Sequence, residues 1–297
     1  MAHHHHTHDH TEGGSDTAID WADMATMLET QAELLAPLYA RALAWLAESV
    51  PEPGLIVDAG SGPGVVSCQF AETFPGARVV AVDGSAPLLE RAGARAERLG
   101  FADRFGTLAG DLPSVLAELE YPADLLWAAR SLHHLGDQGA ALTAFADRLA
   151  PGGTLALLEG GLPSRFLPRD IGFGRPGLQA RIDAVEAEWF ERMRVGLPGA
   201  VTGEENWPAM LTAAGLRHTS TRTFLLDLPA PVSDAARAHV AASLTRLRDA
   251  CADGIDPEDR ATLDRLLDPE DEASVHHRPD VFVLSAHTVY TAVRVAG

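Results

Sequence analysis

The sequence predicts an α/β protein built on a doubly wound, mainly parallel sheet. Three observations carry this prediction. Short apolar segments alternate with helical segments between residues 55 and 159, which is typical of parallel strands covered on both faces. The first apolar segment runs into a glycine-rich turn, VDAGSGPG, at residues 57–64. Acidic residues lie at the ends of the first three strands, where ligands of such sheets bind.

Composition limits the classes of partner. The 297 residues carry 42 acidic and 23 basic side chains, a formal charge of −19, and none of the basic residues is lysine. Binding to nucleic acid or to an anionic membrane surface depends on clustered positive charge, so we expect neither partner. The lack of lysine also excludes Schiff-base and P-loop chemistry.

The start of the chain is rich in histidine. Residues 1–16 are interpreted as a disordered tail or an affinity tag rather than a metal-binding tract, and the sequence leaves open whether they are native. Cys68 and Cys251 form no CxxC pair, and no apolar run reaches about 18 residues. We therefore expect a cytoplasmic protein.

The elements follow in order along the chain. Residues 17–50 show helical spacing and are predicted to form a helical cap, with Pro37 opening a second helix. Residues 51–160 form the predicted ligand-binding core. Its strands are expected at 55–59, 78–82, 105–109, 124–129 and 154–159, and its helices at 63–74, 87–99, 113–120 and 137–149.

The rhythm changes after residue 160. Residues 161–203 begin rich in glycine and proline and contain one helical stretch, 178–195, so they are predicted to form a lid. Residues 204–297 complete the fold. They are expected to hold a helix at 204–214, a strand at 216–228, a helical insertion at 231–268 and a last strand near 281–295. The helical insertions could supply the face of a homodimer.

The glycine-rich turn has a specific physical interpretation. Gly60 permits a tight turn, Gly62 lets the backbone approach a ligand, and Gly64 suits close packing as a helix begins. A dinucleotide site would show GxGxxG, whereas here the third glycine comes one position early. Carboxylates at Asp58, Asp83 and Asp111 would repel a pyrophosphate and suit a cationic nucleoside that carries an ammonium and a sulfonium.

Five segments resemble, in order and spacing, the motifs of class I S-adenosylmethionine-dependent methyltransferases: VDAGSGPG, VVAVDGS, AGDLP, ADLLWAARSLHHL and LAPGGTLALLEG. The resemblance implies a Rossmann-like sheet of seven strands with an antiparallel end, and S-adenosyl-L-methionine as cofactor. It places Asp58 near the amino group, Asp83 on the ribose and Asp111 on the adenine amine. The other implied cofactor contacts are Gly60, Ser61, Gly62, Gly84, Ser85, Gly110, Leu112, Ala129 and Arg130, the last two through their backbone.

Methyl transfer from a sulfonium is an in-line displacement, so the enzyme must align the acceptor and in some cases remove its proton. The resemblance favours His134 as the catalytic histidine, and His133 is the alternative. Glu159 is a candidate for a second acid or base, or for a contact to the substrate. The spacing of these three residues carries no metal-ligand signature, so no metal is predicted.

Aromatic residues outside the core are candidates for the substrate site. Trp21, Tyr39 and Phe173 are the preferred ones, because they fall in the cap and the lid. The predicted function is methyl transfer to an oxygen or nitrogen of a small organic molecule, with a place in bacterial secondary metabolism suggested by composition. The alternative is an enzyme of the same fold that binds the cofactor but catalyses a non-methylating reaction such as cyclisation.

Overall fold

A computed structural model describes residues 24–50 and 52–295. Its centre is a seven-stranded sheet in the order β3-β2-β1-β4-β5-β7-β6, in which β7 is antiparallel to both of its neighbours. The strands are β1 (Leu55–Ala59), β2 (Arg78–Asp83), β3 (Phe105–Ala109), β4 (Ala123–Ala129), β5 (Leu149–Arg165), β6 (Leu216–Leu228) and β7 (Val283–Arg294). The predicted fold class is confirmed.

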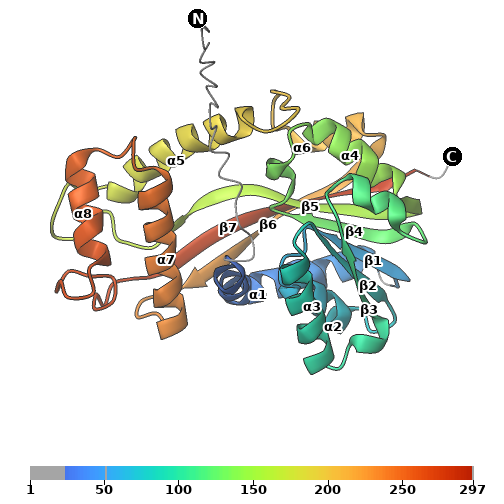
Figure 1. Cartoon of the computed structure of the whole chain (residues 1–297), viewed down its shortest axis with the longest axis horizontal. Coiled ribbons are helices and arrows are strands. Elements are labelled where there is room, and N and C mark those ends of the chain that lie inside the picture. The colour runs from blue at the N-terminus through green and yellow to red at the C-terminus, as the bar shows by residue number, and fades with distance from the viewer. Residues whose placement is uncertain (1–23, 51, 296–297) are drawn as a thin grey trace, which may run out of the picture.

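Helices cover both faces of this sheet (Figure 1). One face packs against α1 (Ala25–Ser49), α2 (Val65–Thr73) and α3 (Ala86–Arg98), and the other packs against α4 (Gln138–Asp147) and α6 (Trp207–Ala213). A Cβ at Gly64 would lie 2.4 Å from the Cβ of Ala92, so only glycine lets α2 and α3 approach this closely. None of the helices within the described residues is long and apolar enough to cross a bilayer.

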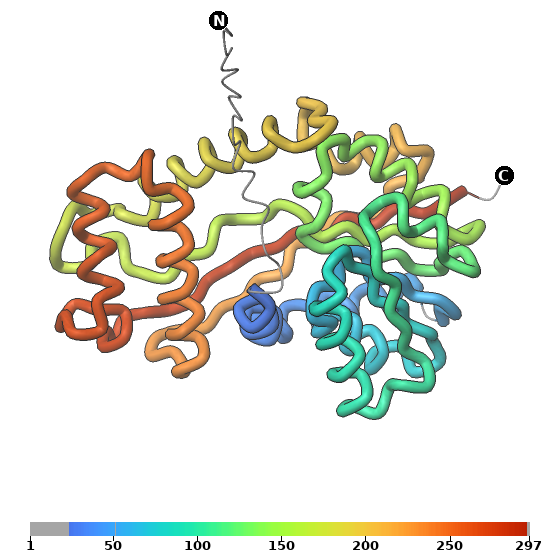
Figure 2. Tube along the Cα trace, in the orientation of Figure 1, coloured from blue at the N-terminus to red at the C-terminus, as the bar shows by residue number. Residues whose placement is uncertain are grey.

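Three further helices pack around the ends of the long strands β5, β6 and β7. The strands β5, β7 and β6 extend beyond the rest of the sheet toward α7 (Asp234–Ala250) and α8 (Pro257–Leu267), while α5 (Leu178–Val195) runs alongside (Figure 2). Apolar residues of α1, α5, α7 and α8 share one core with the sheet. The segments after residue 160 therefore pack into the same body as the parallel sheet.

Two elements differ from the sequence prediction. Pro37 lies inside a single α1 and opens no second helix, because buried residues on both sides of it, Leu35 and Leu38, hold the helix in the core. β5 runs to Arg165 instead of ending near residue 159, because β7 continues the antiparallel pairing, with Arg165 opposite Leu284.

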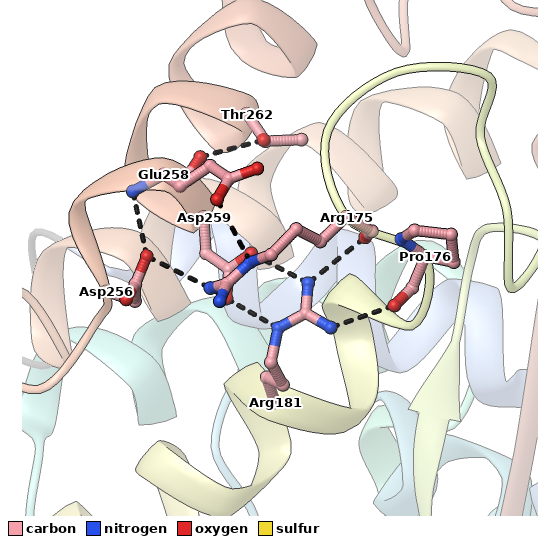
Figure 3. Close-up of polar contacts among 7 residues, drawn as sticks. All are labelled: Arg175, Pro176, Arg181, Asp256, Glu258, Asp259 and Thr262. Carbon is pink, nitrogen blue, oxygen red and sulfur yellow. Dashed lines mark hydrogen bonds and ion pairs between the residues drawn. The ribbon is translucent and has the colours of Figure 1, made fainter.

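The buried carboxylate of Asp259 in α8 binds Arg175, which precedes α5, and Arg181 in α5 (Figure 3). The side chain of Asp259 is only 3% exposed, and its Oδ2 accepts hydrogen bonds from Arg175 Nη2 at 2.8 Å and Arg181 Nε at 2.7 Å. Arg181 Nη2 also donates to Asp259 Oδ1 at 2.7 Å, and its Nη1 donates to the Pro176 carbonyl at 2.8 Å. Such bidentate, charge-assisted pairing fixes the geometry of both segments.

Candidate functional site

The turn between β1 and α2 leaves its backbone open to a ligand. The backbone N–H groups of Gly60 and Ser61 both donate to the Val82 carbonyl, at 2.8 and 3.0 Å, and this fixes the turn against β2. Gly62 has φ +53°, and a Cβ there would meet nothing within 4 Å. A ligand can therefore approach the main chain at Gly62 without a side chain in between.

Asp83 organises the neighbouring strand end. Its Oδ2 accepts a hydrogen bond from the Gly62 N–H at 2.9 Å, and its Oδ1 accepts one from the Ser85 N–H at 2.9 Å. A carboxylate has about four acceptor positions, so Asp83 keeps acceptor capacity for the hydroxyl groups of a ligand. The half-buried side chain thus shapes the turn and faces the same edge of the sheet.

Asp111 joins this edge from β3. The Gly110 N–H donates to the Asp83 carbonyl at 3.1 Å, and a Cβ at Gly84 would lie 3.2 Å from Asp111 Oδ1. Leu112 is half-buried beside it, and its Cδ1 would lie 3.8 Å from a Cβ at Gly60. The structure therefore brings together the residues predicted from the second and third strand ends.

Asp58 lies underneath the turn. It is 2% exposed, and its Oδ2 accepts a hydrogen bond from Ser67 Oγ of α2 at 2.5 Å. Burial raises the pKa of Asp58 to about 7, the Ser67 hydrogen bond opposes that rise, and the charge of Asp83 adds to it. The structure thus directs Asp58 toward α2, so it supports the turn from below.

The end of β4 turns sharply at Arg130. Ala129 is half-buried and pairs with Leu158 of β5, and the Arg130 N–H donates to the Leu158 carbonyl at 2.9 Å. Arg130 has φ +54°, which costs a non-glycine residue about 1 kcal/mol or more and is common at functional sites. The side chain of Ser131 then anchors the loop by donating to the Ala59 carbonyl at 3.1 Å.

Glu159 contacts the loop that carries the two candidate catalytic histidines. It is 5% exposed, its Oε1 accepts the Leu132 N–H at 3.0 Å, and its Oε2 lies 3.2 Å from His133 Nδ1. The rings of His133 and His134 are 4.2 Å apart. Burial is the largest cause that lowers the pKa of His134 to about 4, and the charges of His133, Arg130 and Arg194 contribute to the same shift. His134 is therefore neutral at pH 7 and lies within the field of Arg130.

The predicted lid touches this loop directly. Arg194, in the last turn of α5, donates from Nη1 to the carbonyls of His133 at 2.9 Å and Leu135 at 2.6 Å. Phe190, one turn earlier, packs its ring 5.7 Å from that of His133. The position of the histidine loop, residues 130–135, therefore depends on α5.

The three aromatic residues predicted for the substrate site have different outcomes. Tyr39 is buried in α1 and contacts the Arg130 side chain. Phe173 packs against the guanidinium groups of Arg265 and Arg278, at 4.5 and 5.9 Å, so the structure does not bring it to the histidine loop. Trp21 lies outside the described residues.

Sequence reasoning missed Phe190 and Arg194 of α5, which contact the loop that carries His133 and His134. No spacing in the sequence marks them, because the packing of α5 brings them to this loop. Within residues 24–50 and 52–295, no group of three or more His, Cys, Asp or Glu side chains is placed to hold a metal ion.

Comparison with known proteins supports the same region. Residues 56–153 match the family described as a methyltransferase domain. Trans-aconitate 2-methyltransferase of Streptomyces coelicolor is 33% identical over 178 residues, which are 58% of this chain and 54% of that protein. The tRNA 5-carboxymethoxyuridine methyltransferase of Escherichia coli K12 is 33% identical over 113 residues, 38% of this chain and 42% of that protein. The chain spans about half the length of the curated relatives it matches.

A solved structure extends the comparison to the fold. A methyltransferase of Haloferax volcanii, in complex with the Trm112 methyltransferase activator, aligns with a TM-score of 0.53 at 18% identity, over 93% of this chain and 95% of that one. At this identity the likeness concerns the fold alone. It covers the segments beyond residue 153 as well as the matched domain.

Proposed function

We propose that the chain, whose residues 56–153 match a methyltransferase domain, transfers a methyl group from S-adenosyl-L-methionine to an oxygen or nitrogen of a small organic molecule. The observation that carries the proposal is the shared edge of β1, β2 and β3. There the open backbone at Gly62 lies within hydrogen-bond distance of Asp83, and Asp111 lies beside Gly84.

The residues at this edge fit the cofactor. The open space over Gly62 leaves room for the methionine portion, and the remaining acceptor positions of Asp83 suit the two ribose hydroxyls. The exposed carboxylate of Asp111 can accept from the adenine amine. When bound, the cofactor supplies an electrophilic methyl group on a positively charged sulfur, and an acidic edge favours such a ligand.

The histidine loop is the part of the chain that faces the acceptor in this proposal. His134 is uncharged at neutral pH, so it can accept a hydrogen bond or a proton from an O–H or N–H group. Glu159 orients His133, which packs against His134, and Arg194 holds the loop from α5. These residues align the acceptor, and in-line alignment is a large share of catalysis by displacement.

A small-molecule acceptor agrees with the charge of the chain. A net charge of −19 without any lysine repels a polyanionic substrate such as RNA, although one relative acts on tRNA. The trans-aconitate relatives act on a small organic acid. The two cysteines are buried free thiols, which is usual in a reducing compartment, so we place the reaction in the cytoplasm.

Methyl transfer is tested with S-adenosylmethionine carrying a radiolabelled methyl group. Purified protein is incubated with trans-aconitate, with a panel of hydroxylated and amino compounds, and with bulk tRNA. The proposal expects label in at least one small molecule and none in tRNA. Label in tRNA alone would contradict the small-molecule assignment. Binding of S-adenosylhomocysteine without methyl transfer to any substrate would favour the non-methylating alternative.

A further inference from the structure

The histidine loop is anchored at its start by the sheet. Ser131 Oγ donates to a backbone carbonyl of β1 at 3.1 Å, and the Leu132 N–H donates to Glu159 Oε1 of β5 at 3.0 Å. Leu132–His134 form one 3₁₀ turn, in which the His134 N–H donates to the Ser131 carbonyl at 3.2 Å. The last carbonyls of such a turn have no donor within it. The end of the loop therefore needs partners from elsewhere in the fold.

One guanidinium of α5 supplies these partners. Arg194 Nη1 donates to the carbonyls of His133 at 2.9 Å and Leu135 at 2.6 Å. Its Nη2 lies 3.5 Å from the Gly136 carbonyl. Within the part of the chain that the structure describes, no ion pair includes Arg194. Its hydrogen bonds are therefore made to the backbone oxygens that end the turn, where a cation is favourable.

The segment after α5 packs on the same end of the loop. The Val201 N–H donates to the Gly136 carbonyl at 3.0 Å. A Cβ at Gly136 would lie 2.1 Å from the Pro198 carbonyl oxygen, so only glycine permits this close approach of the two backbones. Arg194 and residues 198–201 thus hold the end of the histidine loop together, and we call them the α5 clamp.

The other end of α5 is fixed to the rest of the fold. Arg181, in the first turn of α5, donates from Nε and from Nη2 to the buried carboxylate of Asp259 in α8, at 2.7 Å each. In the middle of the helix, Glu186 Oε1 lies 3.7 Å from Arg246 Nη2 of α7. A helix anchored in this way can hold the histidine loop in one position.

The two histidines lie between the anchors from the sheet and the α5 clamp. Phe190 of α5 packs its ring 5.7 Å from that of His133, whose ring is 4.2 Å from that of His134. Misplacement of a catalytic group by about 1 Å can cost about 100-fold in rate. The α5 clamp therefore acts where a small shift matters for the reaction.

We propose that Arg194 is a positioning residue for methyl transfer, which acts on the acceptor through His134. Arg194 itself touches neither the acceptor nor the cofactor in this arrangement. It fixes the carbonyls on both sides of His134, and so fixes the direction of the imidazole. This proposal rests on the proposed function, because it concerns the same site and the same reaction.

The kinetic test uses the small molecule that wild type methylates. Arg194→Gln should lower kcat about 10- to 100-fold, while the KM of the acceptor and the affinity for S-adenosylhomocysteine change less than about 3-fold. Arg194→Lys should recover part of kcat, because the ammonium keeps the charge but not the fork. Gly136→Ala should lower kcat as well, because its Cβ displaces residues 198–201 and leaves the Arg194 side chain intact.

A double-mutant cycle distinguishes positioning from a general loss of structure. Because Arg194 acts through His134 in this proposal, Arg194→Gln combined with His134→Gln should be less than about 3-fold slower than His134→Gln alone. A combined loss equal to the product of the two single losses would overturn the proposal, since Arg194 would then act independently of His134.

Hydrogen exchange tests the α5 clamp without an acceptor. In saturating S-adenosylhomocysteine, the amide hydrogens of His134 and Leu135 should exchange at least about 10-fold faster in Arg194→Gln and in Gly136→Ala than in wild type, and those of β1 should be unchanged. The matched control is Arg192→Gln, which removes an exposed arginine from the same last turn of α5 and should behave as wild type in every assay.

Three further results would contradict the positioning role. One is a kcat of Arg194→Gln within about 3-fold of wild type, and another is exchange of the histidine loop as slow as in wild type. The third is a loss of S-adenosylhomocysteine affinity as large as the loss of kcat, since Arg194 would then support the cofactor. Failure of the proposed function looks different. Wild type itself would then methylate no compound, and the positioning role would fall with it, whereas the exchange rates would still report on the α5 clamp.

Discussion

Asp58 is a residue whose charge state is set by the fold. Its pKa rises from an ordinary 3.8 to about 7, so between these values the folded chain holds a proton that the unfolded chain has lost. Folding stability contributed by this group is therefore full at pH 4 and declines as the pH rises toward 7. An asparagine at this position does not titrate and can still accept the hydrogen bond from Ser67.

The prediction is that Asp58→Asn gains stability relative to wild type as the pH rises. The difference in the free energy of unfolding between variant and wild type should be about 2–4 kcal/mol more favourable to the variant at pH 8 than at pH 4. Urea denaturation at the two pH values measures it, and taking the difference removes the titration of other groups. An equal difference at both pH values would show that Asp58 is not a buried, protonated carboxyl.

His134 gives a prediction about rate. Replacement by glutamine should lower kcat about 100-fold or more, because a positioned acid or base contributes about 10²–10⁴ to the rate. The affinity for S-adenosylhomocysteine should change less than about 3-fold. Because the pKa of His134 is about 4, kcat/KM of the wild type should not vary with protonation of this group between pH 6 and 9.

The matched control is His276→Gln, which alters an exposed histidine far along the chain and should leave kcat unchanged. A kcat for His134→Gln within about 3-fold of wild type would remove His134 from the catalytic step. A kcat/KM that falls as the pH is lowered, with an apparent pKa near 6.5, would show instead that a histidine in an ordinary environment controls the reaction.

Residues of the site differ in how far the sequence could reveal them. Asp83 and Asp111 were predictable, because parallel strands carry their C-terminal residues to one edge and the motifs mark those strand ends. Phe190 and Arg194 were not, because their contacts with the loop that carries His133 and His134 depend on the packing of α5. Arg130 was predicted to follow β4, as it does, but its φ of +54° appears only in the structure.

At the scale of elements, Asp259 connects two parts of the fold. Its hydrogen bonds join α8 to Arg175, which precedes α5, and to Arg181 in α5 (Figure 3). The Arg181 hydrogen bond is the largest of the contacts that hold the pKa of Asp259 below its usual range, so these contacts stabilise the ionised form. Asp259→Asn should reduce the free energy of unfolding by about 1–3 kcal/mol, because two guanidinium groups lose a buried charged acceptor. Urea denaturation at pH 7 measures this loss.

The matched control is Asp264→Asn on the same helix. The Asp264 side chain is 56% exposed and lies 3.4 Å from Arg248, so its loss should cost less than about 0.5 kcal/mol. Equal effects of the two substitutions would show that the network does not join α8 to the segment before α5. Because the ionised form is stabilised, the Asp259 contribution should also disappear as the pH falls below about 4.

Some element boundaries can be predicted from local sequence patterns and others cannot. The alternation of strands and helices up to residue 153 is regular, because the central parallel strands β1 and β4 are buried on both faces. The extension of β5 to Arg165 has a different cause. Its exposed residues, such as Leu162, are paired by β7 across more than 120 positions of sequence, which no local pattern reports.

At the scale of the whole molecule, the net charge of −19 predicts the class of substrate. Bulk tRNA should show no binding at about 150 mM salt in a filter or mobility assay, because affinity for phosphate backbones requires clustered cations. Submicromolar binding that weakens with salt would contradict this and would align the chain with its tRNA-modifying relative.

The central claim is that the edge formed by Gly62, Asp83 and Asp111 binds the cofactor, and calorimetric titration with S-adenosylhomocysteine tests it most directly. Wild type should bind with a stoichiometry of one, Asp111→Asn should bind about 10-fold more weakly, and Asp83→Asn should bind about 10- to 100-fold more weakly, while both variants stay folded by circular dichroism. Unchanged affinity in both variants, or binding of NAD in place of S-adenosylhomocysteine by the wild type, would contradict the account.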